Sequence, residues 1–226
     1  MHVSDLHSWD LTPAEAVALQ RELAGRVDTS APLGRLEVVA GADVSCNRFS
    51  DVIYAGVVVL KLPGLEVIER QGAVLETHFP YVPGLLTFRE GPALLKALAR
   101  VRSEPDVVVF DGQGIAHPRR LGLASHLGLW LDRPSVGCAK SRLTGTFKEL
   151  GRKAGSTAFL TDHDQVVGKV VRTRDGVKPV FVSPGHRIDL EGSVEAVLAC
   201  RKGYRLPEPT RLADQFVNEL RRSGAC

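Results

Sequence analysis

The run Val107-Val108-Val109-Phe110, which comes directly before Asp111-Gly112-Gln113-Gly114, is the feature that most constrains the fold. An uninterrupted apolar run of this length predicts a strand that is buried on both faces of a sheet. A carboxylate and a glycine loop at the carboxyl end of such a strand occupy the place where α/β sheets usually hold their chemistry. A plain Asp-Gly turn would use the same residues. The run therefore favours an α/β core, with Asp111 as a candidate site residue.

Further helices and strands are predicted on both sides of this run. Thr12, Pro13 and Glu15 form an N-cap pattern, which predicts a first helix ending at Gly25. Gly91-Pro92 is predicted to open a helix that runs to Val101. Three β-rich stretches with short connections, residues 36–44, 52–60 and 65–75, predict an antiparallel meander. Later segments are a helix over 121–131, a strand over 135–138, β structure near 166–171 and 180–182, and helices near 193–200 and 211–222.

The order of these elements predicts the architecture. Strands followed by alternating helices and strands indicate an α/β fold, a mixed sheet with the antiparallel three-strand meander at one side and helices on both faces. Nothing resembles a linker or an internal repeat, so we expect one domain over residues 1–226. A hydrophobic fraction of 44%, a charged fraction of 24% and a mean hydropathy of -0.01 exclude a mainly disordered or fibrous chain. The net charge of +3 allows a polyanionic partner without requiring one.

Cysteine spacing and the lengths of apolar segments indicate the cellular compartment in which the protein is expected to function. Cys46, Cys138, Cys200 and Cys226 are isolated from one another, which predicts a reducing, cytoplasmic environment rather than a disulfide scaffold. The chain has no stretch of about 20 apolar residues and no signal-peptide pattern, so neither export nor a membrane partner is expected. A monomer is the simplest expectation for a chain of this length.

Four carboxylates at element ends form a candidate metal site. Asp43 interrupts the apolar stretch 38–44, where burial would be costly without a partner. Taken singly, Asp43 could face solvent on an edge strand, Glu90 could be a first-turn helix charge, and Asp214 could lie on a solvated helix face. Together with Asp111 they can converge on one sheet edge, and an oxygen-rich cluster suits Mg²⁺ or Mn²⁺ rather than Zn²⁺. Metal-assisted phosphoryl chemistry is then the natural hypothesis.

Six motifs occur in order along the chain: Val39-Ala40-Gly41-Ala42-Asp43-Val44-Ser45, Pro80-Tyr81-Val82-Pro83-Gly84-Leu85-Leu86-Thr87-Phe88-Arg89-Glu90, Asp111-Gly112-Gln113-Gly114-Ile115-Ala116-His117-Pro118-Arg119, Gly137-Cys138-Ala139-Lys140-Ser141, Ser183-Pro184-Gly185-His186-Arg187 and Pro209-Thr210-Arg211-Leu212-Ala213-Asp214. They resemble the motifs of one enzyme family, endonuclease V, the deoxyinosine-directed repair nucleases. The similarity extends from about residue 10 to about residue 220. In the second motif Val82 stands where isoleucine is common in that family, a difference of one methylene group.

The resemblance implies an RNase H-like fold and Mg²⁺-dependent hydrolysis of DNA that contains deoxyinosine, with Mn²⁺ as a substitute ion. The implied cut is at the second phosphodiester bond on the 3′ side of the deaminated base. It leaves a 3′-hydroxyl and a 5′-phosphate, and the base stays attached. Carried over by motif, Asp43 and Asp111 are the principal metal ligands, while Glu90 and Asp214 complete the acidic site directly or through water.

The resemblance also assigns two further residues and one loop. Lys140 would stabilise charge or orient the attacking water, and His117 would approach the substrate backbone. The segment Pro80-Tyr81-Val82-Pro83 is stiff, because each proline fixes its own φ and restricts the residue before it. It would hold Tyr81 as a wedge that stacks on a base or fills the space of a base turned out of the helix. An ordinary proline-rich loop with a surface tyrosine is the alternative.

Deamination gives the base a chemical mark that a backbone-lined pocket can recognise. Hypoxanthine presents a carbonyl acceptor and a ring N–H where adenine presents a donor and an acceptor, and close walls can exclude the extra amino group of guanine. Glycine lets the backbone approach a ligand, although turns and cores use the same residues. The pocket candidates are Gly84, Leu85, Gly112, Gly122 and Leu143. Candidate phosphate contacts are Arg89, Arg119, Arg120, Lys140, Arg142 and Lys148.

The sequence is compatible with two other functions. The first is an inosine-directed endoribonuclease on the same fold, because the sequence does not measure the preference for one sugar over the other. The second is a binding module that recognises lesions without cutting. The intact residues Asp43, Glu90, Asp111 and Lys140 argue against the binding module.

Overall fold

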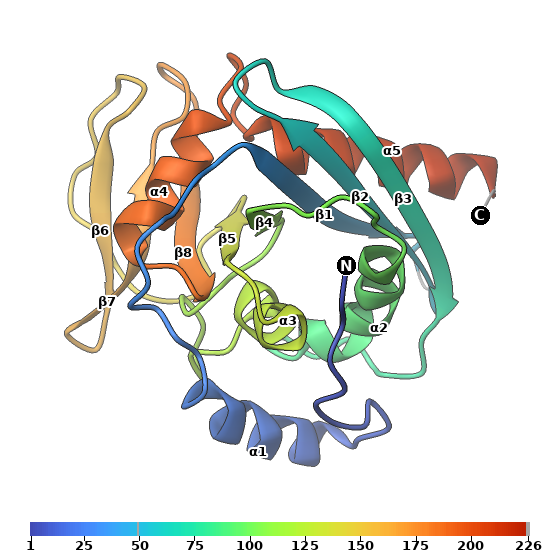
Figure 1. The fold of residues 1–226 in the computed structure, drawn as a ribbon. Helices are drawn as coiled ribbons and strands as arrows, with labels where there is room; N and C mark the ends of the chain where they lie inside the picture. Colours follow the sequence, from blue (N-terminus) through green and yellow to red (C-terminus); the bar gives the residue numbers. More distant parts are fainter. Residues whose placement is uncertain (49, 225–226) are drawn as a thin grey trace.

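One mixed sheet runs through the computed structural model, which describes residues 1–48 and 50–224 (Figure 1). Within those residues the sheet has eight strands in the order β3-β2-β1-β4-β5-β8-β7-β6. The strands are β1 (Val38–Cys46), β2 (Val52–Lys61), β3 (Glu66–Glu76), β4 (Val107–Phe110), β5 (Ser135–Ala139), β6 (Thr157–Asp162), β7 (Gln165–Val171) and β8 (Val180–His186). The helices of the same residues are α1 (Pro13–Ala24), α2 (Leu86–Ala99), α3 (Leu123–Leu131), α4 (Leu190–Ala199) and α5 (Glu208–Ser223), none of them long and apolar enough to cross a membrane.

The sheet joins an antiparallel part to a parallel part. β1, β2 and β3 pair antiparallel, and their ends agree with the predicted meander to within two residues. β4 lies parallel to β1, and β5 lies parallel to β4. β8, β7 and β6 then extend the sheet in antiparallel fashion. The predicted α/β class with a mixed sheet is confirmed.

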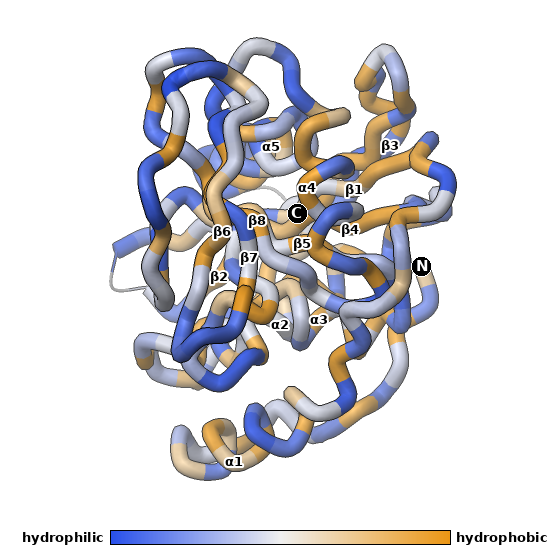
Figure 2. The backbone as a smooth tube through the Cα atoms, turned by 90° about the vertical axis from the view of Figure 1, so that its left-hand side faces the viewer, coloured by the Kyte–Doolittle hydropathy of each residue, from blue (hydrophilic) through white to orange (hydrophobic). Residues whose placement is uncertain are grey.

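Helices cover both faces of the sheet, as the sequence predicts. On one face, Leu94 and Leu98 of α2 and Leu127 of α3 join a buried cluster with strand residues. On the other face, Val197 of α4 and Ala213 of α5 join a second cluster. All four residues of β4 are buried, which confirms the predicted central strand. Figure 2 shows hydrophobic colour along the middle of the sheet, where these two clusters meet it.

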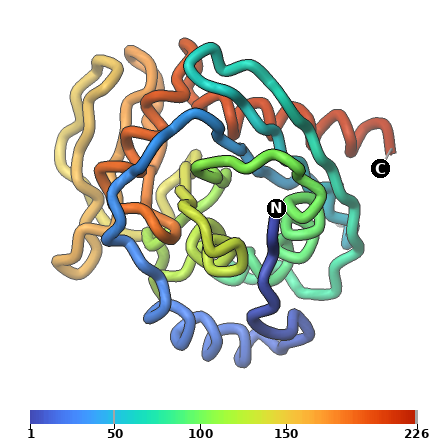
Figure 3. The backbone as a smooth tube through the Cα atoms, in the orientation of Figure 1, coloured from blue at the N-terminus to red at the C-terminus, as the bar shows by residue number. Residues whose placement is uncertain are grey.

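Helix α1 lies on the outer side of α2 and α3 (Figure 3). Its predicted capping pattern is confirmed, because the Glu15 N–H donates to the Thr12 hydroxyl and the Glu15 carboxylate accepts from the Thr12 N–H at 2.8 Å. Gly25 ends the helix, as predicted. Leu23 packs in a buried cluster with Leu121, the residue that leads into α3. These contacts hold α1 against the side of the fold where the pocket walls lie.

Helix α2 begins at Leu86, five residues before the predicted start at Gly91-Pro92. Pro92 removes a single helical hydrogen bond, the one that its missing N–H would donate to the Phe88 carbonyl. Burial of the apolar face of this helix outweighs that loss, since packing rather than propensity stabilises most helices in proteins. The correction places Glu90 in the second turn of α2 rather than before its start.

Strand β6 has no predicted counterpart. It lies at the edge of the sheet, and along it only Leu160 is buried, so the strand lacks the apolar run that marks a buried strand. Helix α4 also begins three residues before the predicted position, at Leu190. The Asp189 carboxylate caps it by accepting from the Gly192 N–H at 2.7 Å.

Candidate metal centre and substrate pocket

The register between β1 and β4 brings Asp43 and Asp111 to the same edge of the sheet. In this parallel pair, Ala42 lies opposite Phe110, and each aspartate is the next residue along its chain. The Asp111 N–H donates to the Ala42 carbonyl at 3.1 Å, so the two segments remain hydrogen-bonded one residue beyond the last paired residues of β1 and β4. Because parallel strands end at one edge, the two carboxylates become neighbours there.

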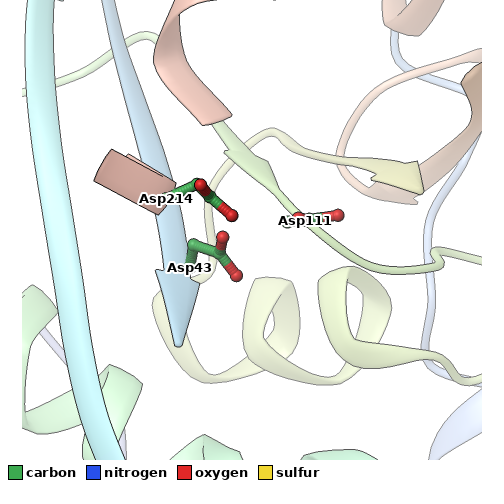
Figure 4. Close-up of side chains that lie close together, drawn as sticks. All are labelled: Asp43, Asp111 and Asp214. Atoms are coloured by element: carbon green, nitrogen blue, oxygen red, sulfur yellow. The ribbon is translucent and has the colours of Figure 1, made fainter. Parts of the chain in front are cut away.

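Helix α5 brings a third carboxylate, Asp214, to this edge. The start of α5 crosses β1 so closely that a Cβ atom on Gly41 would lie 2.1 Å from the carbonyl carbon of Pro209. Only glycine permits such an approach between the two backbones. Asp214 lies in the second turn of α5 and points toward Asp43 of β1 and toward Asp111, which follows β4 (Figure 4). The crossing at Gly41 therefore positions the third carboxylate.

The three carboxylates face one another (Figure 4). Asp43, Asp111 and Asp214 each offer one oxygen, and these oxygens all lie within 4.8 Å of one another. Asp43 is buried, and the other two side chains are partly buried. Across residues 1–48 and 50–224, no other set of three or more His, Cys, Asp or Glu side chains meets this distance criterion. The structure thus brings together three of the four carboxylates that the sequence nominates.

The electrostatics of this group favour a positive ion. Burial, and next the charge of Asp111, raises the pKa of Asp43 to about 9. Burial also raises the pKa of Asp111, although the charge of Lys140 opposes that shift. A raised pKa means that the surroundings compensate the ionised carboxylate poorly. A divalent ion would replace the protons and supply the missing charge.

Lys140 supplies part of that positive charge. It follows the last residue of β5, and its Nζ atom lies 2.5 Å from Asp111 Oδ2 and 3.0 Å from Asp214 Oδ1. Burial alone would lower the pKa of Lys140, but the charge of Asp111 and hydrogen bonds to Asp111 and Asp214 raise it above its ordinary value. The ammonium group therefore stays protonated at neutral pH and acts as a hydrogen-bond donor, not as a base.

Glu90 lies in the wall of the neighbouring cavity but outside the group of three carboxylates. Burial, followed by the charge of Asp111, raises the pKa of Glu90 to about 8. The family resemblance implies that Glu90 contacts the metal either directly or through water. Its place in α2, apart from the three clustered oxygens, favours contact through water.

A cavity of about 440 Å³ opens beside the carboxylates. This volume lies within the range of small-molecule sites, so the cavity is large enough for a nucleobase. Twelve of the residues that the sequence nominates line it: Asp43, Tyr81, Pro83, Gly84, Glu90, Asp111, Gly112, His117, Gly122, Lys140, Arg142 and Leu143. Further lining residues are Val44, Val82, Leu86, Thr87, Gln113, Leu123, Ala139 and Ser141.

Six nominated substrate or phosphate contacts lie outside this lining: Pro80, Leu85, Arg89, Arg119, Arg120 and Lys148. Leu85 is a buried core residue in the cluster that contains Phe79 and Phe88. The Arg89 guanidinium donates to the carbonyls of Phe79 at 2.7 Å and Ser50 at 2.9 Å, so it ties two loops together. In this structure Leu85 therefore packs in the core and Arg89 binds backbone carbonyls, and neither residue lines the cavity.

The loop that carries Tyr81 is anchored at Gly84. Tyr81 itself is 72% exposed, whereas the Gly84 carbonyl accepts hydrogen bonds from Gln20 at 3.0 Å and from Arg119 at 2.8 Å. Gly84 has a φ of 79°, a conformation that favours glycine, and a Cβ atom there would lie 2.8 Å from the Arg119 guanidinium. The anchor fixes the end of the loop while leaving the tyrosine ring in solvent.

His117 belongs to the same anchor. Its Nδ1 atom accepts from the Arg119 N–H at 3.2 Å, so the proton resides on Nε2, which donates to the Gly84 carbonyl at 3.0 Å. Burial, and next the charge of Arg119, lowers the pKa of His117 to about 4. His117 is therefore neutral at physiological pH and holds the tyrosine loop from inside the cavity wall.

Two glutamines at the site are absent from the sequence-based candidates. Gln113 donates to the Ser141 carbonyl at 2.9 Å, and its buried Oε1 has no hydrogen-bond partner within the described part of the chain. Its position between two glycines of the Asp111 motif is a signal that could have marked it. Gln20 reaches the Gly84 and Leu121 carbonyls from α1, and nothing local in the sequence marks such a long-range contact.

Comparison with known proteins gives one family. The endonuclease V family model matches residues 21–215 of this chain. Endonuclease V of Dehalococcoides mccartyi is 50% identical over 96% of this chain and 98% of its own length.

Solved structures agree with the sequence comparison. The crystal structure of Streptomyces avermitilis endonuclease V is 43% identical, with a TM-score of 0.91 over 99% of both chains. A Ciona intestinalis endonuclease V is 27% identical, with a TM-score of 0.80 over 93% of this chain and 98% of the other. That protein was solved in complex with a 24mer DNA containing an inosine followed by a ribo-adenosine. The RNase H-like α/β architecture expected from the motifs is the architecture of these solved structures.

Proposed function

This chain belongs to the endonuclease V family and is a nuclease, and on that premise we propose that it cleaves DNA at deoxyinosine, the product of adenine deamination. The proposed reaction is hydrolysis of the second phosphodiester bond on the 3′ side of the lesion, which leaves a 3′-hydroxyl and a 5′-phosphate. The observation that carries the proposal is the group of Asp43, Asp111 and Asp214 beside a cavity of nucleobase size. The inosine-containing DNA bound by the Ciona relative supports the choice of lesion.

The proposed cofactor is Mg²⁺, with Mn²⁺ as a substitute. The donor set fits a hard cation, because it consists of carboxylate oxygens within 4.8 Å of one another. Asp43, Asp111 and Asp214 would hold the ion, with Glu90 acting through water. When bound, the ion would neutralise charge that develops on the scissile phosphate and favour ionisation of the attacking water.

Lys140 has a defined part in this proposal. Its ammonium group remains charged and lies against Asp111 and Asp214, at the border between the carboxylates and the cavity. A fixed positive donor in this place would stabilise negative charge on the phosphate or orient the attacking water. His117 would act nearby by holding the tyrosine loop against the substrate backbone.

Recognition of the lesion is proposed to combine Tyr81 with the cavity. The exposed Tyr81 ring would enter the stack when the inosine turns out, and the cavity would receive the base. Backbone groups of Gly84, Gly112 and Gly122 in the cavity wall would test the pattern of donors and acceptors on the base. Because the Gly84 carbonyl already accepts from Gln20 and Arg119, Gly84 would contribute its N–H.

We also propose that the protein acts as a cytoplasmic monomer. Cys138 and Cys200 are buried free thiols, and Cys46 is an exposed free thiol, as a reducing compartment allows. Sedimentation or light scattering of the purified chain would measure its oligomeric state.

The function is tested with matched oligonucleotide duplexes that carry either one inosine or one adenine at the same place. We expect nicking of the inosine strand with Mg²⁺ or Mn²⁺, and sequencing of the products to place the cut at the second phosphodiester bond. Failure to nick with either ion would overturn the proposal. A parallel RNA substrate with one inosine separates a deoxyribonuclease from an inosine-directed ribonuclease.

Replacing Tyr81 with alanine is expected to weaken the preference for inosine. A stacking ring contributes about 1–3 kcal/mol per base, so kcat/KM for the inosine duplex should fall by about 5- to 150-fold. Metal binding should not change, because Tyr81 lies outside the carboxylate group. The matched control is Tyr204→Ala, which removes another exposed tyrosine outside the cavity lining. Equal discrimination by the Tyr81 variant and the unaltered protein would rule out the wedge.

A further inference from the structure

Exposed hydrophobic side chains gather at one place outside the carboxylate site. Among the described residues, eight large hydrophobic side chains are exposed, and four of these lie between residues 143 and 166. They are Leu143, Phe147, Phe159 and Val166, of which Phe159 is 56% exposed. Single exposed apolar side chains are ordinary, but several at one place mark a contact surface.

Three of these side chains, Phe147, Phe159 and Val166, line a second cavity of about 630 Å³, while Leu143 lines the first. We call the surface formed by residues 143–149 and the β6–β7 hairpin the hairpin face; it lies at the edge of the sheet opposite β3 (Figure 1). A bridge between Thr146 and Thr161 ties the loop to β6. The Phe147 ring packs edge-on against Phe181, with ring centroids 6.0 Å apart. The cavity is lined by Thr146, Phe147, Lys148, Glu149, Thr157, Ala158, Phe159, Thr161 and Val166.

The charge of the chain is concentrated around this face. Residues 140–178 contain nine lysines and arginines against four acidic residues, a net charge of +5. Because the whole chain carries +3, the remainder has a net charge of -2. One of the four acidic residues, Asp162, is already paired with Arg120 at 2.7 Å. The region therefore carries the positive charge that a polyanion would meet.

Several of these cations are available to a ligand. The side chains of Arg142, Lys148, Arg152 and Lys153 are exposed, and none forms an ion pair within residues 1–48 and 50–224. Lys148 lies in the wall of the second cavity beside the two phenylalanines. Lys169, in contrast, is paired with Glu191 and lies 5.0 Å from the centre of the Phe159 ring.

The hairpin face is continuous with the active-site cavity. Leu143 lines the first cavity and Thr146 lines the second, so the two are joined by a single loop. Three residues of extended chain span at most about 11 Å. Successive nucleotides of a stacked strand are about 3.4 Å apart along the helix axis, so this distance corresponds to about three nucleotides. A strand held in the first cavity would therefore reach the second.

We infer that the hairpin face binds the nucleic-acid strand of the substrate where it leaves the active-site cavity. The basic side chains would contact phosphates, and a base would stack on the exposed Phe159 ring. Exposed aromatic rings in one cavity wall with the unpaired Lys148 suit a strand with accessible bases, whereas a protein or membrane partner would not need the alignment with the active site. The inference rests on the proposed function, because it assumes that the strand is the substrate.

The test compares short and long labelled oligonucleotides that each contain one inosine. Binding is measured by fluorescence anisotropy without divalent ions, so that no cleavage occurs. Oligonucleotides extended by about eight nucleotides on the 3′ or the 5′ side should bind more tightly than a core of about five, because the extension reaches the hairpin face. In the double variant Phe159→Ala/Lys148→Ala, we expect the affinity for whichever extended oligonucleotide binds more tightly to fall by about 10- to 100-fold, and the affinity for the core oligonucleotide to stay the same. The slope of log K against log salt should fall by about 0.7 for the lost phosphate contact.

Two control variants keep this test decisive. The variant Ile68→Ala/Lys61→Ala removes an exposed apolar side chain from the opposite edge strand, β3, and an exposed basic side chain from its neighbour β2, and should bind like the unaltered protein. Phe159→Trp should restore stacking, and Phe159 is exposed enough that its variants should fold. Equal affinity of core and extended strands, or an unchanged double variant, would overturn the inference. So would a dimer that Phe159→Ala separates into monomers. Nicking of inosine DNA by the unaltered protein is scored separately, so these failures would leave the proposed function intact.

Discussion

The Asp43→Asn variant is expected to nick deoxyinosine DNA at least about 10³-fold more slowly than the unaltered protein, a loss of about 4 kcal/mol in transition-state stabilisation. Asparagine keeps the size of the side chain and one oxygen, but it removes a charge from the three carboxylates that lie within 4.8 Å of one another. Lesion binding should remain, because Tyr81 and the Gly84 anchor are unaltered. Single-turnover rates and anisotropy measure these two effects separately.

The same substitution should stabilise the protein when divalent ions are absent. Because burial raises the pKa of Asp43 to about 9, the folded state binds more protons than the unfolded state between about pH 4 and pH 9. The protonated Asp43 side chain therefore contributes fully to the free energy of unfolding at low pH, and this contribution is lost as the pH rises toward 9. The asparagine amide does not titrate, so the variant should gain about 1–3 kcal/mol at neutral pH, or several degrees in Tm.

A matched exposed aspartate provides the control. Asp10 is exposed, precedes α1 and lines neither cavity, and Asp10→Asn should leave the nicking rate and the Tm unchanged. Added Mg²⁺ should raise the Tm of the unaltered protein, because an ion that binds only the folded state stabilises that state. It should have little effect on the Tm of the Asp43 variant, which lacks one of the ligands. An active Asp43→Asn protein would contradict the assignment of this residue to the metal centre.

Much of this centre could be predicted from the sequence because its positions follow from local patterns. The buried run of β4 predicts both a central strand and the place of Asp111 after it. The apolar stretch before Asp43 predicts a second strand, and two parallel strands bring their carboxyl ends to one edge. The capping box at Thr12 and Glu15 is equally local and sets the start of α1. Such features need no knowledge of distant contacts.

The remaining features depend on contacts between distant parts of the chain. The start of α2 before Pro92 reflects burial of its apolar face, and propensity alone argues for a later start. The two carbonyls that accept hydrogen bonds from Arg89 lie 10 and 39 residues away from it in the sequence. Local sequence shows only a basic residue near the site, which predicts a phosphate contact and not these backbone contacts. Gln20 joins α1 to Gly84 across 64 residues. The separation of Glu90 from the clustered oxygens likewise emerges only when α2 packs on the sheet.

Gly41→Ala is expected to lower the Tm by about 6–12 °C, because it forces two backbones apart. The new Cβ atom would lie 2.1 Å from both the carbonyl carbon and the oxygen of Pro209, which are main-chain atoms at the start of α5. Overpacking in a close-packed core typically costs about 1–3 kcal/mol, and this contact should lie at the upper end of that range. For a chain of this size, each kcal/mol lowers the Tm by about 2–4 °C. Thermal unfolding followed by circular dichroism measures the shift.

The same displacement should weaken the metal centre, because α5 carries Asp214. If α5 moves away from β1, the Asp214 oxygen leaves the group that holds Asp43 and Asp111 within 4.8 Å. We therefore expect the folded variant to need about 10-fold more Mg²⁺ for half-maximal nicking, since lost ligand geometry lowers affinity. Gly34→Ala is the matched control, because a Cβ atom there meets nothing within 4 Å. A Gly41 variant that is destabilised but keeps its Mg²⁺ requirement would show that α5 follows the sheet as it shifts, and that the close crossing serves stability alone.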